Sequence, residues 1–220
     1  DNPIGHPSPI IVTNYPYING DWTTGDPSTY FNGRIYYSRN TGDWNNKQNW
    51  STDTILTHNG QSASYFPGQI YDLDIVNIDG HNITVRNLNK ILIDSLRIGG
   101  TNSNGISGNL IFDNNLVSTN LTTRSFFADA DNGEININTT AGIDTLQVSQ
   151  LFINRSNSPN GLQFYRDPSN NLVLKIVGSG NLSIDGEGTY RNLSNIIVDK
   201  IGGLSDTLIV NSTSFASATL

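Results

Sequence analysis

The chain has 220 residues and a formal net charge of −7, with 12 lysines and arginines against 19 aspartates and glutamates. An acidic chain without clustered basic residues cannot neutralise phosphates, so we expect no nucleic-acid partner. The absence of cysteine excludes disulfides and thiolate metal sites. No apolar run approaches the roughly 20 residues that a membrane-spanning helix needs, so we expect no membrane span.

The composition predicts an all-β protein. Good helix formers are scarce, since glutamate occurs only at Glu134 and Glu187, while glycine alone contributes 21 residues. Hydrophobic residues make up only 35% of the chain, but they are placed in alternating runs rather than scattered. The chain begins at Asp1 and contains no methionine, which is expected of a mature protein that has lost its leader or of an excised fragment.

The stretch from Asp1 to Asn40 is rich in proline and aromatic residues. The prolines interrupt every candidate strand except the run Ile10-Ile11-Val12. We therefore predict an extended N-terminal arm over residues 1–40 and a second domain over residues 41–220. In the arm, Ile10, Ile11 and Val12 form a candidate assembly strand, able to add to the exposed edge of a neighbouring subunit.

The second domain begins with an aromatic segment, residues 42–70, that contains Trp44 and Trp50. An uncovered end of a stacked β structure exposes apolar core and unpaired strand edges, so such an end needs a cap. We predict that Trp44 and Trp50 provide this cap. The alternative is that these tryptophans, together with Trp22, stack on sugar rings.

Beyond residue 70, short alternating runs are separated by Gly, Asn, Asp and Ser, a pattern typical of successive β-strands. The predicted strands are Ile75 to Ile78, Ile83 to Val85, Ile91 to Ile98, Asn109 to Phe112, Glu134 to Asn138, Thr145 to Ile153, Leu172 to Val177, Leu182 to Ile184, Ile196 to Val198 and Thr207 to Val210.

Three of these segments carry nearly the same sequence, at residues 93–98, 143–148 and 205–210. Recurrence without a strict period indicates coils with loops of variable length. We therefore predict a β-solenoid, with coils of roughly 20 to 25 residues. The alternative is a β-sandwich, whose strands recur at similar intervals.

The segment from Gly42 to Phe112 resembles a strand-turn module of large secreted surface proteins of Bacteroidota, including gliding-motility adhesins and other cargo of the type IX secretion pathway. The resemblance implies a right-handed parallel β-helix and a secreted, extracellular or cell-surface location. The residues that carry it are Asp43-Trp44-Asn45, Asn49-Trp50-Ser51, Pro67-Gly68, Asp74 to Ile78, Gly80 and Ile83 to Val85.

The tripeptide Asp-(Ser/Thr)-aliphatic occurs more often than the composition predicts, and it is similar to the O-glycosylation acceptor of secreted Bacteroidota proteins. A structural explanation is equally open, in which the aspartate ends a turn and the aliphatic residue points into the core. The candidate acceptors are Thr54, Ser95, Thr145 and Thr207.

No catalytic site is predicted. The histidines His6, His58 and His81 are too far apart in sequence to form a local metal motif. Three aspartates between residues 72 and 79 lie beside a Pro-Gly turn, where carboxylates usually accept hydrogen bonds from backbone amides.

One short segment has features of a calcium loop. Asp129, Asp131 and Glu134 have the spacing of the first ligands of such a loop, with Gly133 between them. The segment lacks the remaining ligand positions of an EF-hand. We therefore expect a simple turn and no cofactor, with calcium as the alternative.

These observations predict a non-enzymatic extracellular protein, either a cell-surface adhesin segment or a filament-forming subunit. Its expected partners are copies of itself, a larger surface assembly or glycans. The alternative is a carbohydrate-binding module or a polysaccharide lyase or hydrolase on a β-helix, which needs acidic and basic residues from successive coils to converge in a groove. The spacing of the few basic residues does not suggest such a row.

Overall fold

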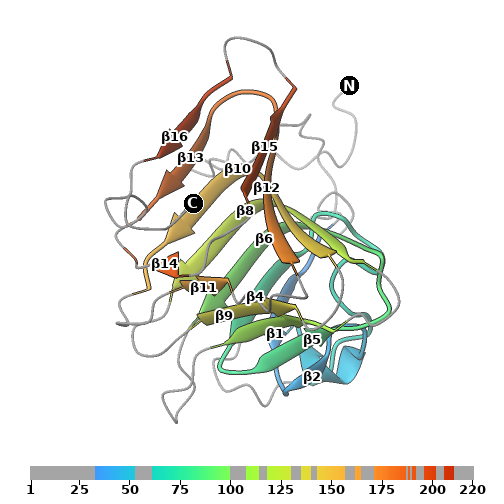
Figure 1. Cartoon of the computed structure of the whole chain (residues 1–220). Helices are drawn as coiled ribbons and strands as arrows, with labels where there is room; N and C mark the ends of the chain where they lie inside the picture. Colours follow the sequence, from blue (N-terminus) through green and yellow to red (C-terminus); the bar gives the residue numbers. More distant parts are fainter. Residues whose placement is uncertain are drawn as a thin grey trace, which may run out of the picture. The chain divides into compact units, whose positions relative to one another are not determined.

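The described part of the chain folds almost entirely into β-strands, as a computed structural model shows (Figure 1). Within it, the one helical element is a 3-10 turn, η1 (Lys47–Asn49), so the predicted all-β class is confirmed. None of its helices is long and apolar enough to cross a membrane. The structure describes residues 33–52, 61–99, 108–113, 118–129, 135–139, 143–156, 162–164, 171–186, 188, 190–191, 196–201 and 206–210, all of which belong to one compact unit, Gly33–Leu220.

The strands form two sheets of ten and six strands. The larger sheet contains β1 (Ile35–Ser38), β3 (Trp50–Ser51), β4 (Ile75–Asp79), β6 (Lys90–Gly99), β8 (Asn120–Asp129), β10 (Ile143–Asn154), β12 (Asn171–Gly178), β13 (Leu182–Asp185), β15 (Ile196–Lys200) and β16 (Leu208–Val210). The smaller sheet contains β2 (Gly42–Asp43), β5 (Asn82–Val85), β7 (Asn109–Phe112), β9 (Ile135–Thr139), β11 (Leu162–Phe164) and β14 (Tyr190–Arg191).

Consecutive strands alternate between the two sheets from β4 to β12. Each passage through the smaller sheet returns the chain to the larger one, where the next strand lies parallel beside the previous one. Among the described strands, β1 with β3 is the one antiparallel pair. This parallel pairing differs from the antiparallel sheets of a sandwich. Along one ladder, Ile75 pairs with Ser95, and Ser95 pairs with Ser125. More residues therefore separate the second pair in the sequence than the first pair.

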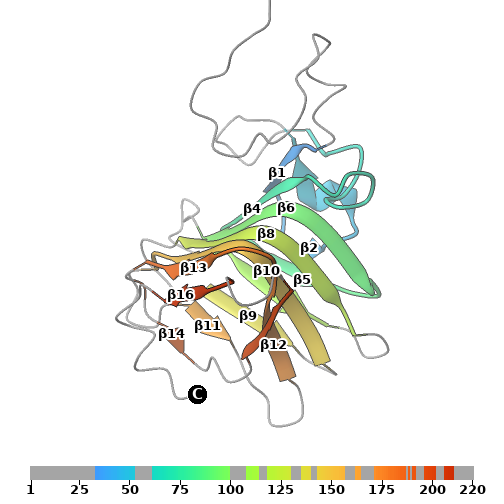
Figure 2. The ribbon, with the colours of Figure 1, turned by 90° about the horizontal axis from the view of Figure 1, so that it is seen from above.

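The long strands β6 and β8 are curved (Figure 2), and the pairing of β10 with β8 changes register between Val148 and Leu151. Residues 143–148 of β10 pair with β12, whereas residues 151–153 pair with β13. In β8, Thr123 is buried although it is polar. Its hydroxyl lies 3.0 Å from the carbonyl oxygen of Asp94 and 2.9 Å from that of Ser125, so the buried group has acceptors.

The core consists of inward-facing side chains stacked in register across the larger sheet. The rings of Phe126 and Phe152 stack with centroids 4.7 Å apart, and Phe164 of the smaller sheet lies 6.4 Å from Phe152. These contacts join the two sheets. One fully buried row comprises Val76, Leu96, Phe126, Phe152 and Ile184.

Every strand predicted beyond residue 70 is present, with ends shifted by at most about two residues. Three strands of this region, β8, β11 and β14, were not predicted. The strand β1 lies inside the stretch assigned to the N-terminal arm, and it pairs with β4. The three recurrent segments do not stack in one row, since Leu96 pairs with Phe126 in one ladder and Leu146 with Leu121 in the other.

Candidate functional site

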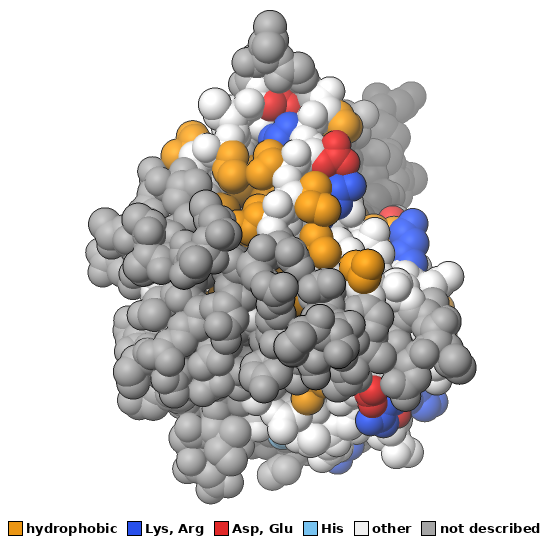
Figure 3. Space-filling model, viewed as in Figure 1, with side chains coloured by type: hydrophobic (Ala, Val, Ile, Leu, Met, Phe, Trp, Pro, Cys, Tyr) orange, Lys and Arg blue, Asp and Glu red, His pale blue; other side chains and the backbone are white. Residues whose placement is uncertain are grey.

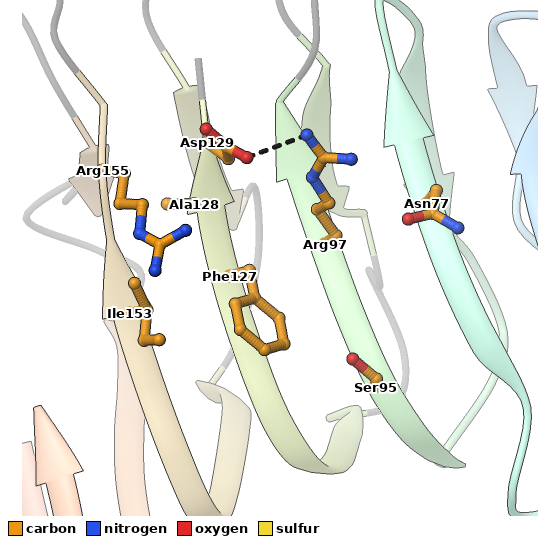
Figure 4. Close-up of a pocket in the computed structure, with 8 residues that line it drawn as sticks. All are labelled: Asn77, Ser95, Arg97, Phe127, Ala128, Asp129, Ile153 and Arg155. Atoms are coloured by element: carbon orange, nitrogen blue, oxygen red, sulfur yellow. Dashed lines mark hydrogen bonds and ion pairs between the residues drawn. The ribbon is translucent and has the colours of Figure 1, made fainter. Parts of the chain in front are cut away.

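An open pocket of about 280 Å³ lies on the outward face of the larger sheet (Figure 4). It spans β4, β6, β8 and the end of β10, so its walls come from four successive strands of the ladder. Its lining residues are Asn77, Ser95, Arg97, Phe127, Ala128, Asp129, Ile153 and Arg155.

Strand alternation places the lining residues outside the core, except for Ala128, which is fully buried. Leu96 and Phe126 point inward and are fully buried, so their neighbours Arg97 and Phe127 point outward. Asn77 pairs with Arg97, Arg97 with Phe127, and Phe127 with Ile153. A polar, a cationic and an aromatic side chain therefore follow one another at the strand spacing of about 4.8 Å.

The lining of the pocket carries three charged groups, Arg97, Asp129 and Arg155. The Arg97 Nη2 atom lies 2.8 Å from Asp129 Oδ2, and both side chains are partly exposed. An exposed pair of this kind contributes at most about 1 kcal/mol to stability. The backbone N–H of Arg155 donates to the carbonyl oxygen of Ala128, which anchors Arg155 beside β8.

The Arg155 guanidinium extends toward β8 (Figure 4). Among the described residues, no carboxylate lies within ion-pair distance of this guanidinium, although other exposed arginines such as Arg86 and Arg97 have such partners. The pocket thus holds two guanidinium groups and one carboxylate. It is locally cationic in a chain whose net charge is −7.

The two tryptophans of the predicted cap are fully buried. Trp44 Nε1 donates to the carbonyl oxygen of Pro67 at 2.9 Å, and Trp50 Nε1 donates to that of Trp44 at 2.7 Å. Their ring centroids lie 5.0 Å apart with an edge-on geometry. Neither ring offers a face to a sugar, because both side chains are 0% exposed. Trp22 lies outside the described residues.

A buried polar group accompanies this aromatic segment. Asp74 accepts hydrogen bonds from the backbone N–H groups of Arg34 and Gly68, each at 2.8 Å. Burial raises the pKa of the Asp74 carboxyl. Burial, with the nearby charge of Asp74, raises the pKa of Tyr36 to about 12. Asp74 thus ties the Pro-Gly turn to the start of β1 and β4, which is a structural task.

The Asp-(Ser/Thr)-aliphatic segments have the features of the structural explanation. Asp144 is buried and accepts from the backbone N–H of Thr119 at 2.7 Å, and Asp206 accepts from that of Gly180 at 2.7 Å. The aliphatic residues Leu96 and Leu146 are fully buried.

The hydroxyl-bearing residues of the same segments point away from the core. Ser95 and Thr145 are half-buried, whereas Thr207 is exposed and its hydroxyl donates to Asn181 Oδ1. Thr54 lies outside the described residues.

The remaining candidates do not come together in the part of the chain that the structure describes. Asp129 pairs with Arg97, while Asp131 and Glu134 fall outside that part. Over the same residues, no group of three His, Cys, Asp or Glu side chains has the arrangement of a metal site. The ring of His81 contacts the Ser38 hydroxyl at 3.0 Å. Further candidates that lie outside the described residues are His6, His58, Ile10, Ile11 and Val12.

The spacing of the basic residues does not suggest a row, but the fold brings two of them to one pocket. Arg97 and Arg155 line the same pocket although they are far apart in sequence. Neither arginine was predicted as a site residue, nor was Phe127. The register of the strands brings them together. Because the paired residues are separated by unequal numbers of residues, this register cannot be deduced from the sequence.

Comparisons of the chain with models of protein families, with curated proteins and with solved structures give no significant match.

Proposed function

We propose that this chain is a non-enzymatic, extracellular structural or adhesive module built on a right-handed parallel β-solenoid. The alternation of strands between two parallel sheets supports the solenoid. The handedness is supported by the general rule that crossovers between parallel strands of one sheet are right-handed in about 98% of cases. The resemblance of residues 42–112 to Bacteroidota surface proteins supports secretion.

The observation that carries this proposal is the difference between the two ends of the strand stack. At one end, β2 and β3 are the terminal strands of the two sheets, and the adjacent Trp44 and Trp50 are fully buried. At the other end, Val198 of β15 continues the row of Val148 and Ile176. Those two residues are fully buried, but Val198 is 51% exposed.

The exposed end is also apolar. Ile197 and Ile201 are 48% and 78% exposed, and hydrophobic side chains gather where β13, β15 and β16 lie (Figure 3). No described strand pairs with the outer edge of β15. An apolar terminal strand with an unpaired edge is a template for adding another strand. We propose that a second copy occupies it, through Ile10, Ile11 and Val12 of its N-terminal arm.

Sedimentation velocity over a range of protein concentrations, together with electron microscopy, tests this assembly. We expect larger species to grow with concentration, and Val198→Lys to reduce them because a charge would be placed on the contact surface. Ile143→Lys is the matched control, since Ile143 is 56% exposed but lies on β10, inside the sheet. A monomer at all concentrations would refute self-assembly.

The non-enzymatic part of the proposal is supported by the charges in the pocket. Most glycoside hydrolases use two carboxyl groups that flank the scissile bond. The pocket contributes one, Asp129, and it is paired with Arg97. Release of reducing ends from polysaccharides incubated with the chain would contradict this part of the proposal and favour the polysaccharide-cleaving alternative.

We also propose O-glycosylation, with Thr207 as the acceptor that an enzyme reaches most readily. Thr207 is exposed, while Ser95 and Thr145 are half-buried within the sheet. Peptide mass spectrometry of protein from its native source is expected to find a glycan on Thr207 more often than on the other two. An unmodified Thr207 would refute this assignment.

A further inference from the structure

We propose that the pocket of Arg97, Phe127 and Arg155 binds an acidic polysaccharide, with one carboxylate-bearing sugar ring seated in it. This inference goes beyond the proposed function, because it assigns a ligand to the module whether or not the module assembles.

The charge of the pocket selects an anion. Asp129 offsets one of the two guanidinium groups through its 2.8 Å contact with Arg97. The Arg155 guanidinium has no such contact among the described residues, so its charge remains available. The planar fork of an arginine matches the two oxygens of a carboxylate. A ligand group with a single negative charge would balance the pocket, whereas a second charge would be repelled by Asp129.

The uncharged lining favours a ring with hydroxyl groups. Phe127 is partly exposed and lies between Arg97 and Ile153 in the same outward row, so Phe127 and Ile153 place two apolar side chains next to each other in the pocket. Sugar rings stack on such surfaces through their apolar faces. Asn77 and Ser95 line the same pocket and can donate to, or accept from, sugar hydroxyls.

The size and openness of the pocket favour one unit of a polymer. Its volume of about 280 Å³ lies just below the roughly 300 to 1,000 Å³ that small-molecule sites occupy. The pocket lies on an outward sheet face rather than inside the core, so the flanking sugars of a chain can continue along the surface (Figure 4).

Isothermal titration calorimetry with a panel of polyuronates tests the proposal. The probes are polygalacturonate, alginate and hyaluronate, each compared with its carboxyl-reduced form, and dextran sulfate serves as a general polyanion. The protein is produced without O-glycans so that Ser95 is unmodified. We expect at least one polyuronate to bind, with affinity at least about tenfold greater than that of its reduced form.

Variants locate the site. Arg155→Gln removes the available guanidinium from an exposed position and is expected to weaken binding about tenfold or more. Arg155→Lys keeps the charge but loses the fork, so an intermediate affinity is expected. Arg124→Gln is the matched control, because Arg124 lies on β8 outside the pocket and makes an ion pair with Asp94. It should change the affinity less than twofold.

Four results would overturn the proposal. They are no binding to any polyuronate, equal binding to the acidic and reduced forms, dextran sulfate binding as tightly as the best polyuronate, and equal losses in Arg155→Gln and Arg124→Gln. Sedimentation of Arg155→Gln separates this proposal from the assembly, since Arg155 follows the end of β10 whereas Val198 lies on β15.

Discussion

The two tryptophans of residues 42–52 are fully buried at the terminal strands β2 and β3. Each indole buries a large apolar area and also satisfies its N–H by donating to a backbone carbonyl. Tyr36 adds an edge-on contact to Trp50 at a centroid distance of 6.5 Å. The two indoles therefore combine apolar burial with hydrogen-bonded N–H groups, as buried tryptophans require.

Truncating one of these indoles should be costly. We expect Trp50→Ala to lower the free energy of unfolding by about 3 to 5 kcal/mol, because the side chain is fully buried and leaves a cavity. Urea unfolding followed by circular dichroism measures this change. Ile70→Ala is the control, since Ile70 is 52% exposed and should cost less than about 0.5 kcal/mol. A Trp50→Ala loss below about 1 kcal/mol would contradict the cap.

A second prediction at this scale concerns pH. Burial raises the pKa of Asp94 above its ordinary value of 3.8, against the opposing charge of Arg124. The folded state therefore holds this proton more tightly than the unfolded state does. The contribution of Asp94 to the free energy of unfolding is greatest below about pH 4 and falls as the pH rises through the folded-state pKa.

Urea unfolding at several pH values measures this contribution. Asp94→Asn should remove the decrease in the free energy of unfolding that Asp94 causes as the pH rises. The variant should therefore gain stability relative to the unmodified chain with increasing pH. Arg124→Gln should steepen the fall, because Arg124 lowers the Asp94 pKa. Parallel stability curves for Asp94→Asn and the unmodified chain would show that the prediction is wrong.

At the scale of strands, close approach between neighbours limits which residues fit. Gly99 ends β6 with a φ of +147°, and a Cβ built there would lie 2.0 Å from the carbonyl oxygen of Asp129. Gly180 also has a positive φ, of +79°, but a Cβ there would meet nothing within 4 Å. Alanine at Gly180 would therefore cause backbone strain alone, whereas alanine at Gly99 would add a steric clash.

We expect Gly99→Ala to cost at least about 2 kcal/mol in the free energy of unfolding, because the methyl group would push β6 and β8 apart. Gly180→Ala should cost about 1 kcal/mol through backbone strain alone. Chemical denaturation of both variants measures the difference. Equal losses would show that the β6 to β8 spacing adjusts freely.

Strand prediction succeeded where alternation was regular and failed where the core contains a polar residue. Leu182 to Ile184 alternates cleanly and was predicted. In β8, the inward position between Leu121 and Phe126 is taken by Thr123, and Phe126-Phe127 breaks the alternation. Hydrogen bonds from the Thr123 hydroxyl make this burial possible, but such acceptors are visible only in the folded structure.

At the scale of the whole unit, each strand contacts mainly its neighbours in the two sheets. Stability in such a ladder is shared between adjacent strands, so terminal strands open more easily than central ones. Amide hydrogen exchange should therefore be slowest in β6, β8 and β10 and fastest in β15 and β16. Mass spectrometry of peptides over these strands measures the order, and uniform exchange would contradict it.

The pocket could not be predicted because it depends on register across the whole stack. Arg97 pairs with Phe127, and Phe127 pairs with Ile153. More residues separate the first pair in the sequence than the second pair. The spacing between paired residues is not constant, so the sequence does not show that Arg97 and Arg155 lie on the same surface. The end tryptophans were more predictable, because their clustering is local.

The unequal intervals between paired residues have a consequence for how this architecture can change. The segment that joins Ile75 to its partner Ser95 is much shorter than the one that joins Leu151 to Ser183, yet both pairs sit in the same kind of parallel ladder. The ladder therefore sets no length for the connecting segments, and lengthening a connection adds little to the entropy cost of closing it. Foreign peptides inserted outside the strands that these connections contain, such as β5 and β11, would leave the core unaltered, which makes the stack suitable as a scaffold for displaying them.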